Sequence, residues 1–389
     1  MSLRNIVVVG ASLAGLRAVD ALRRHGYGGS ITWIGAEPEL PYDRPPLSKQ
    51  ILRGEWEPAR ASLKANYDAF GTDLRLGTRA RALDLRDRTV ALEGGARVPF
   101  DGLVIATGAT PKTLRGAAGL SGVFTLRTLG DALEIKRALE ACPRVAVIGA
   151  GFIGLEVAAS CRMLGLDVTV LEALDTPLAA AIGRRMGDAI AEMHRERGVH
   201  LRTGVMVQGF EGSGRVSALR LSDGTVEPAD LVIVGVGVTP ETGWLEGSGL
   251  ALGDGVLCDE RCAASAEGVV ACGDVARFKR SNGDTARIEH WTNAVEQAAA
   301  AVARLLDGPK APPFSSVPYF WSDQYDAKIQ FAGSAAPDDA IRIVEGSVAE
   351  RNLVAHYGRA GRLTGVLTVN KPAALVRGRR AIGEGAAFD

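Results

Sequence analysis

Two stretches of the chain share one pattern of apolar and polar positions. Residues 5–37 and 144–172 each begin with a β-branched apolar run, turn on glycines, continue with helical spacing, and end in another apolar run and an acid. A short apolar run bounded by glycines predicts a buried strand, and apolar residues three and four apart predict a helix packed on it. Each stretch is therefore expected to form a strand–turn–helix–strand unit of a doubly wound parallel sheet.

Further apolar runs follow each of these units. Residues 97–112 contain a run that closes on Ala106, Thr107 and Gly108, and residues 226–241 nearly repeat it. Just before the second run, Ser-Asp-Gly between two alternating segments predicts a β-hairpin. The repetition indicates that both units are built on the same plan.

The rest of the chain adds a strand, a helix and a tail. An apolar strand is expected to end at Gly273-Asp274, and residues 289–306 predict a long helix. Residues 307–314, DGPKAPPF, form a proline-rich linker, and the pattern beyond it suggests a small mixed domain. We therefore expect an α/β fold with two Rossmann-like dinucleotide-binding domains and a small α+β C-terminal domain.

The composition excludes several classes of function. The 389 residues are 47% hydrophobic and 23% charged, and Lys+Arg equals Asp+Glu at 45 each, so no global charge attracts nucleic acid or membranes. The first apolar run leads straight into glycines, which is typical of a strand rather than a signal peptide. No uncharged run approaches the roughly 18 residues of a membrane span. Five cysteines without framework spacing indicate a reducing compartment, so we expect a cytoplasmic protein.

The second unit carries a complete glycine motif. Gly149, Gly151 and Gly154 form G-x-G-x-x-G, in which the first glycine allows a tight turn, the second lets the backbone approach a pyrophosphate, and the third lets helix and strand pack closely. Glu172 ends the next predicted strand, where a carboxylate can accept hydrogen bonds from ribose hydroxyls. This unit is expected to bind a dinucleotide.

The first unit departs mildly from that motif. Gly10 and Gly15 are present, but Ser12 stands at the second glycine position, and Glu37 is the candidate for the ribose. Asp274, beside a glycine at the end of a buried strand, can accept from a polyol such as the ribitol of FAD. The alternative is that Asp274 is a turn or N-cap residue. Two nucleotide-binding units suggest two cofactors that exchange a hydride.

Several motifs occur in a fixed order from residue 5 to about residue 335: GASLAG, PYDRPPLSK, ATGA, GAGFIGLE, ACGD, EHWTNA and PYFWSDQYD. In this order the chain resembles the FAD-dependent, NADH-utilising ferredoxin reductases, the family of putidaredoxin reductase, rubredoxin reductase and the reductases of aromatic-ring dioxygenases. The resemblance implies a glutathione-reductase-like architecture. It assigns residues 1–112 and 239–311 to an FAD-binding domain, 113–238 to an inserted NADH-binding domain, and 312–389 to the C-terminal domain.

The resemblance also implies which residues contact FAD. The matching positions are Gly10, Ser12, Ala14, Gly15, Glu37, Arg44, Lys49, Ala80, Ala106, Thr107, Gly108, Arg127, Asp274 and Trp291. It implies Ala14 and Gly15 at the pyrophosphate, Glu37 at the adenosine ribose, Ala80 at the adenine, Arg127 near the phosphates, Arg44 and Lys49 along the flavin, Asp274 at the ribitol, and Trp291 beside the isoalloxazine.

In the second unit the resemblance implies NADH contacts and one departure. The matching positions are Gly149, Gly151, Phe152, Ile153, Gly154, Glu156 and Glu172. Glu172 on the ribose 2′-hydroxyl would repel a 2′-phosphate, so NADH is expected to be preferred over NADPH. Similar sequences usually carry arginines soon after that glutamate, whereas this chain has Thr176 and Ala180. We therefore expect an ordinary NAD preference with weaker affinity.

The implied reaction is hydride transfer from NADH to FAD, followed by release of single electrons to a [2Fe-2S] ferredoxin or rubredoxin that feeds a cytochrome P450 or a ring-hydroxylating dioxygenase. No metal is required, and the histidines have no metal-ligand spacing. The family geometry would bring Lys49 and Glu156 together beside the flavin as the catalytic pair, where an ammonium stabilises the reduced ring. The alternative is a surface lysine and a glutamate favoured by the helix macrodipole.

The tail is locally basic, with Arg359, Arg362, Lys371, Arg377, Arg379 and Arg380. Ferredoxins of the implied type are acidic, so complementary charge could raise encounter rates, although most such runs are only a solvated face. This face is the candidate docking surface.

Three rival functions remain. Flavoprotein disulfide reductases and NADH oxidases of this architecture need a cysteine after the first unit, and none occurs between residues 1 and 141, which excludes their usual forms. A quinone-reducing NADH dehydrogenase would need an amphipathic membrane-binding tail. A redox-responsive binding protein similar to apoptosis-inducing factor could keep the fold without fast turnover.

Overall fold

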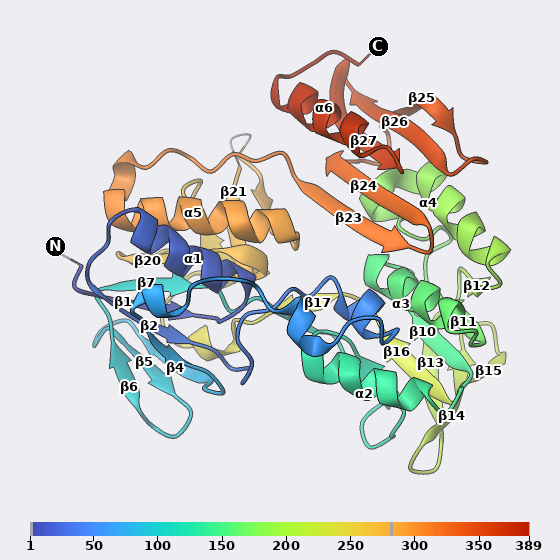
Figure 1. The fold of residues 1–389 in the computed structure, drawn as a ribbon, viewed down its shortest axis with the longest axis horizontal. Coiled ribbons are helices and arrows are strands. Elements are labelled where there is room, and N and C mark those ends of the chain that lie inside the picture. The colour runs from blue at the N-terminus through green and yellow to red at the C-terminus, as the bar shows by residue number, and fades with distance from the viewer. Residues whose placement is uncertain (1–2, 281–282, 389) are drawn as a thin grey trace. The chain divides into compact units, whose positions relative to one another are not determined.

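The computed structural model of the protein describes residues 3–280 and 283–388. The chain forms two units, each assembled from separate stretches of sequence (Figure 1). The first unit takes the stretch up to Asp43, Ser62–Thr110 and Thr239–Pro318, and the second takes Arg44–Ala61, Pro111–Val238 and the chain from Tyr319. The division into three domains at the sequence boundaries given above stays a prediction.

The first unit is built on a five-stranded parallel sheet with the order β20-β7-β1-β2-β3. Its strands are β1 (Asn5–Val9), β2 (Ser30–Ile34), β3 (Asp73–Arg75), β7 (Gly102–Ile105) and β20 (Val269–Ala271). Helices α1 (Leu13–Arg24) and α5 (Trp291–Asp307) pack side by side over one face (Figure 1). Strands covered on both faces read as continuous apolar runs, which explains the pattern of β1 and β7.

Two antiparallel sheets complete the first unit, with the orders β4-β5-β6 and β18-β19-β21-β22, in which β19 and β21 alone run parallel. Their strands are β4 (Ala80–Asp84), β5 (Thr89–Leu92), β6 (Arg97–Pro99), β18 (Leu252–Gly253), β19 (Gly255–Cys258), β21 (Ala276–Lys279) and β22 (Thr285–Ala286). Short 3₁₀ turns are η3 (Asp68–Phe70), η4 (Gly243–Leu245), η5 (Gly273–Val275) and η6 (Gly308–Lys310).

The second unit repeats this plan on another parallel sheet, with the order β12-β11-β10-β16-β9. Its strands are β9 (Val123–Thr125), β10 (Val145–Ile148), β11 (Val168–Leu171), β12 (His200–Arg202) and β16 (Leu231–Val234), and its helices are α2 (Leu129–Leu139), α3 (Phe152–Met163) and α4 (Ala179–Glu196). An antiparallel sheet contains β13 (Val207–Gly212), β14 (Val216–Leu221) and β15 (Val226–Pro228). The predicted hairpin is confirmed, because Arg220 pairs with Val226 across the Ser-Asp-Gly turn.

The C-terminal part of the second unit is a five-stranded antiparallel sheet with the order β23-β24-β27-β26-β25. Its elements are β23 (Tyr319–Gln324), β24 (Ala327–Gly333), β25 (Ala340–Ser347), β26 (Asn352–Arg359), β27 (Arg362–Val369) and α6 (Pro372–Gly383). Helix α6 packs on β24 and β27 (Figure 1). The predicted small α+β domain and the α/β fold class are confirmed.

Three details differ from the sequence-based expectation. The apolar run at 97–112 is divided, because Asp101 turns the chain after β6, and its carboxylate accepts from the backbone N–H groups of Arg4 and Asn5 at 2.8 and 2.9 Å. The short strands β8 (Ala109–Pro111) and β17 (Val238–Pro240) lie where the chain passes from one unit to the other. The long helix α5 begins two residues later than expected.

The proline-rich loop at 41–49 is not wholly irregular either. Its end forms a π-helical turn, η1 (Leu47–Ile51), in which the Ile51 N–H donates to the Pro46 carbonyl at 3.0 Å. A 3₁₀ turn, η2 (Pro58–Ala61), comes next. In the second unit η1 packs against α2 and α3. Within the described residues, no helix is both long and apolar enough to span a bilayer.

Candidate active site

The glycine turn of the second unit is shaped for close backbone approach. A Cβ added at Gly154 would overlap the carbonyl oxygen of Gly149, and one added at Gly149 would overlap that of Gly235. A Cβ at Gly151, in contrast, would meet no atom within 4 Å. Gly151 is the N-cap of α3, so the first-turn N–H groups of that helix, which have no intrahelical partner, follow directly after it. The turn therefore offers an anion-binding cradle.

Glu172 borders this turn. One carboxylate oxygen accepts from the Ala150 N–H at 2.7 Å, and the other accepts from the Leu174 N–H at 2.9 Å. These two bonds fix the carboxylate at the carboxyl end of β11, next to the glycine turn. Phe152 and Ile153 occupy the first turn of α3, with Ile153 half-exposed. The structure thus brings the sequence-predicted residues of this unit together.

The first unit has an equivalent turn with tighter packing. A Cβ at Gly10 would overlap the Ala106 carbonyl oxygen, and a Cβ at Gly15 would overlap that of Gly10, which also accepts from the Trp33 indole at 3.0 Å. Ser12 is the N-cap of α1, but its side chain makes no capping hydrogen bond in the described chain. The Ser12 side chain therefore does not occupy the backbone N–H groups at the start of α1.

Other predicted residues of the first unit lie around the same sheet. Glu37 accepts a hydrogen bond from the Tyr42 hydroxyl. The Thr107 hydroxyl donates to the Glu241 carbonyl at 2.8 Å, and Gly108 adopts a positive φ of 71°. Ala80, at the start of β4, and Ala14, in the first turn of α1, are buried.

Asp274 lies inside η5 rather than at its N-cap, which is Cys272. A Cβ at the preceding Gly273 would lie 3.0 Å from Ala14, so this strand end packs directly on the first turn of α1. Burial lowers the pKa of the nearby His290 to about 4, although Asp274 opposes that shift. His290 is therefore neutral at pH 7.

The proline-rich loop holds two predicted residues through partners that sequence reasoning missed. In the first unit, Asp43 accepts from the Trp291 indole N–H at 2.8 Å and so fixes that ring. In the second unit, the Arg44 guanidinium donates to the Arg127 carbonyl, which brings the two arginines together. The sequence signal for the contact between Asp43 and Trp291 was the aspartate of the PYD motif, because an indole N–H needs a hydrogen-bond acceptor.

Lys49 and Glu156 form a buried ion pair. The Lys49 ammonium lies 2.7 Å from a Glu156 carboxylate oxygen, and both side chains are less than 8% exposed. The same oxygen accepts from the Ser48 hydroxyl at 2.5 Å, and the other accepts from Ser322 at 2.7 Å. The alternative of a surface lysine is wrong. Such a pair requires several further hydrogen bonds to offset its desolvation, and the two serines supply them.

No two of the five cysteines form an exposed dithiol. All five are free, and only Cys142 is exposed. Burial raises the pKa of Cys161, Cys258 and Cys272 to about 12 and that of Cys262 well above its ordinary value. These four thiols are small core side chains. Among the described residues, no cluster of acids, histidines and cysteines could hold a metal ion.

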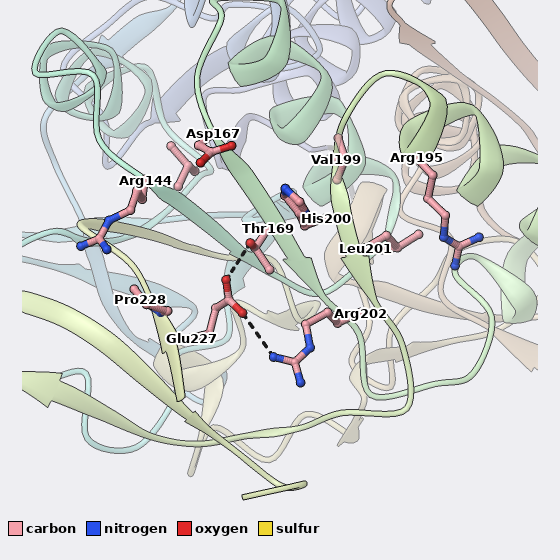
Figure 2. A pocket seen from close by; sticks show the side chains of 11 residues that line it. Arg144, Asp167, Thr169, Arg195, Val199, His200, Leu201, Arg202, Glu227 and Pro228 are labelled. Atoms are coloured by element: carbon pink, nitrogen blue, oxygen red, sulfur yellow. Dashed lines mark hydrogen bonds and ion pairs between the residues drawn. The ribbon is translucent and has the colours of Figure 1, made fainter. Parts of the chain in front are cut away.

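A hollow of about 550 Å³ lies at the opposite end of the second parallel sheet from the glycine turn (Figure 2). It is lined near the beginnings of β10 and β11 and along β12. Glu227 is one of its lining residues and accepts from Thr169 at 2.8 Å and from Arg202 at 3.2 Å. Ligands of open parallel sheets bind beyond the carboxyl ends of the strands, so this hollow is not the nucleotide site.

Comparison with known proteins decides the family. The profile of the pyridine nucleotide-disulphide oxidoreductases matches residues 4–298, and the reductase C-terminal profile matches residues 319–389. The chain belongs to the pyridine nucleotide-disulphide oxidoreductase family. As a member of this family it is an oxidoreductase that uses FAD and NAD(H).

Two members of the family and one solved structure are similar to almost the whole chain. Rhodocoxin reductase from Rhodococcus erythropolis is 38% identical over 95% of this chain and 87% of its own. The ferredoxin–NAD(+) reductase component of the p-cumate 2,3-dioxygenase system from Pseudomonas putida is 37% identical over 99% and 94%. The covalent complex of putidaredoxin reductase with putidaredoxin has a TM-score of 0.93 at 36% identity, over 98% of this chain and 93% of the other.

The two glycine turns fit the cofactors of the family. In each, crowded glycines let the backbone turn tightly into the start of a helix, and the N–H groups of a helix start are suited to a pyrophosphate. The two positions at which similar sequences usually carry arginines differ in exposure. Thr176 is buried and donates to Asp188 at 3.1 Å, whereas Ala180 is exposed. A side chain at position 176 therefore points into the packing of α4, so Ala180 is the exposed site of the missing arginine.

Proposed function

We propose that this protein is an NADH-dependent ferredoxin reductase. It takes a hydride from NADH on FAD and passes the two electrons singly to a [2Fe-2S] ferredoxin, which feeds a cytochrome P450 or a ring-hydroxylating dioxygenase. The names of the relatives support this proposal, because they are reductases of rhodocoxin, putidaredoxin and a dioxygenase ferredoxin. The five free thiols support a cytoplasmic location.

The observation that carries the proposal is the buried Lys49–Glu156 pair in a chain without an accessible dithiol. Disulfide reductases of this family pass electrons through a cysteine that comes after the first unit. Here the first cysteine is Cys142, and four of the five thiols are buried with raised pKa values. Electrons therefore leave for an external one-electron carrier.

Bound FAD supplies the chemistry of accepting a hydride and releasing single electrons. The protein supplies a fixed positive charge at the Lys49 ammonium, held within 2.7 Å of Glu156. A preorganised ammonium in a water-poor site stabilises negative charge that develops beside it, and it needs no reorientation during the reaction. We assign these two residues as the catalytic pair, with Glu156 orienting Lys49.

We assign the remaining cofactor contacts as the resemblance implies. Glu37, Arg44, Arg127, Asp274 and Trp291 would hold FAD together with the first glycine turn, and the second turn with Glu172 would hold NADH. Glu172 is already fixed by two backbone N–H groups, which supports a role in presenting its charge to a ribose. A lower KM for NADPH than for NADH would contradict that role.

The proposed docking surface contains only some of the basic residues of the tail. Internal ion pairs engage several members of that tail: Arg359 with Asp339 at 2.6 Å, Lys371 with Glu345 at 2.8 Å, and Arg380 with Glu384 at 2.8 Å. Arg379 lies over the Tyr319 ring at 5.9 Å. Within the described residues Arg362 and Arg377 have no ion pair. Val376, beside Arg377 on α6, is 70% exposed. An apolar side chain among arginines suits a partner with an acidic rim, so we propose that the ferredoxin docks on α6.

The proposal is tested by NADH-dependent reduction of cytochrome c, with and without a panel of [2Fe-2S] ferredoxins and a rubredoxin. Strong dependence on at least one of these carriers is expected. Equal rates with and without every carrier, or rates that rise only with a quinone, would overturn the assignment.

A further inference from the structure

A chain of buried polar side chains leads away from the Glu156 carboxylate. The Ser322 hydroxyl lies 2.7 Å from one Glu156 oxygen, and the Gln324 amide nitrogen lies 3.0 Å from the Ser322 hydroxyl. Ser322 and Gln324 are two residues apart on β23, so they share one face of that strand, and both are fully buried. Two polar residues on the covered face of a strand need a reason, because each must find partners inside the protein.

The chain continues to a buried histidine. The Gln324 amide oxygen lies 2.8 Å from His194 Nε2, and the Tyr325 hydroxyl lies 3.1 Å from His194 Nδ1. His194, on α4, has no exposed surface, and Tyr325 is only partly buried. All members belong to the second unit. The chain therefore connects Glu156 to the surface through Tyr325.

The ionised carboxylate dictates the direction of every bond. A carboxylate only accepts, so Ser322 donates to it and must accept from the Gln324 amide N–H. The amide oxygen then faces His194, which must carry its proton on Nε2 and accept from Tyr325 at Nδ1. Burial lowers the pKa of His194 to about 4, consistent with this neutral tautomer. Four donors thus point the same way, an arrangement in which neighbouring bonds strengthen one another.

Resting on the proposed role of the Lys49–Glu156 pair, we propose that Ser322, Gln324 and His194 are positioning residues that hold the Glu156 carboxylate in the orientation that presents Lys49. The chain does not carry protons, because the Gln324 amide would have to become an imidic acid to pass one. It instead makes the C-terminal sheet a structural part of the site: β23 supplies one of the hydroxyls that orient Glu156, and η1 supplies the other at Ser48.

The first test reads the tautomer in the intact holoenzyme. With ¹⁵N-labelled histidine, NMR at pH 7 should show His194 neutral with its proton on Nε2, and the signal should disappear in a His194→Gln variant. A proton on Nδ1, or a charged ring at pH 7, would overturn the proposal, since either state breaks the order of donors.

The second test removes donors one at a time. Ser322→Ala deletes a hydrogen bond to a charged group, so flavin reduction by NADH in a stopped-flow instrument should slow about tenfold, and the flavin spectrum should shift. Gln324→Glu keeps the shape but cannot donate to Ser322 when its carboxylate is ionised, so its flavin spectrum should acquire a pH dependence that the parent lacks. KM for the ferredoxin should stay unchanged in both variants.

A matched control is Thr368→Val on β27 of the same sheet. Its hydroxyl is fully buried and has no hydrogen-bond partner in the described chain, so its loss should leave both the spectrum and the rate of reduction unchanged. If Ser322→Ala fails to fold, the flavin spectrum of Gln324→Glu decides whether the proposal holds. Folded variants with parental spectra and rates would refute the positioning chain. If Lys49→Met slows reduction while these variants do not, the chain alone fails; if Lys49→Met also has no effect, the proposed pair fails.

Discussion

At the scale of single residues, the loop after the first nucleotide unit is where disulfide reductases of this family carry a cysteine, and here that loop contributes Lys49 to an ion pair. Lys49 and Glu156 are both buried, so neither can be removed without leaving the other charge uncompensated. Ser48 and Ser322 satisfy the carboxylate from two directions. Truncating either side chain should therefore change the rate of flavin reduction and the free energy of unfolding by different amounts.

Lys49→Met is the most direct test of the pair. The variant should retain FAD but reduce it at least tenfold more slowly with NADH, because the fixed positive charge is gone. Stopped-flow absorbance measures the rate, and the bound flavin spectrum reports on its surroundings. The exposed Lys64→Met is the control for the loss of a charge. Equal rates in parent and Lys49→Met would refute the catalytic role.

His194 makes stability depend on pH. Its pKa is about 4 in the folded protein and 6.5 ordinarily, so the unfolded chain binds a proton that the folded chain excludes between these values. The contribution of His194 to the free energy of unfolding is thus at its full value above about pH 6.5. It falls by about 1.4 kcal/mol per pH unit as the pH drops toward 4. In urea unfolding at pH 7 and pH 5, the parent should lose about 2 kcal/mol more than His194→Gln. The exposed His25→Gln should lose as much as the parent, and equal losses in all three would contradict the assignment.

At the scale of elements, the two glycine turns explain what the sequence could predict. Strand β10, the turn and α3 follow from local spacing, since a tight turn and a close helix each require glycine at a fixed position. Both units carry a three-stranded antiparallel sheet, β4-β5-β6 in the first and β13-β14-β15 in the second. Only the second was foreseen, because its Ser-Asp-Gly turn has a strong signal, whereas the Arg86–Arg88 region that joins β4 and β5 has none.

The buried polar chain shows why the rest of the site could not be foreseen. Ser322 and Gln324 flank Asp323 at the end of β23, and three consecutive polar residues after the aromatic run are typical of the solvated end of a strand. The structure instead buries those polar residues against α3, where Glu156 needs donors. Such a reversal depends on a partner far away in the sequence, and only tertiary structure supplies it.

A pair of glycine variants tests the turn of the second unit. Gly151→Ala has open space and an ordinary φ of −74°, so the protein should fold and melt normally while NADH binds about tenfold more weakly. Gly154→Ala would place its methyl group on the Gly149 carbonyl, so it should lower the melting temperature strongly. Calorimetry and NADH titration separate the two effects. Normal melting in Gly154→Ala would contradict the close packing of this turn, and parental NADH affinity in Gly151→Ala would contradict its assignment to NADH.

At the scale of the whole molecule, a formal charge of zero makes any attraction to an acidic partner local. Arg377→Glu on α6 should raise KM for the ferredoxin several-fold and weaken its dependence on ionic strength, because screening acts over about 10 Å at 0.1 M salt. Reduction of ferricyanide should not change. Arg86→Glu, on an exposed turn of the first unit, alters the net charge equally and should have no effect on KM. Equal effects of the two variants would exclude docking on α6.

The threading of the chain through its two units has a consequence for biosynthesis. The polypeptide passes from one unit to the other after Asp43, Ala61, Thr110, Val238 and Pro318. Strand β20 at the edge of the first sheet, and α5 on its face, are translated only after the second nucleotide turn is complete. The first unit therefore cannot complete its fold on the ribosome until most of the chain has been translated. Until then, its N-terminal half has an exposed sheet edge. Premature termination before α5 should yield chains that aggregate rather than a smaller working enzyme.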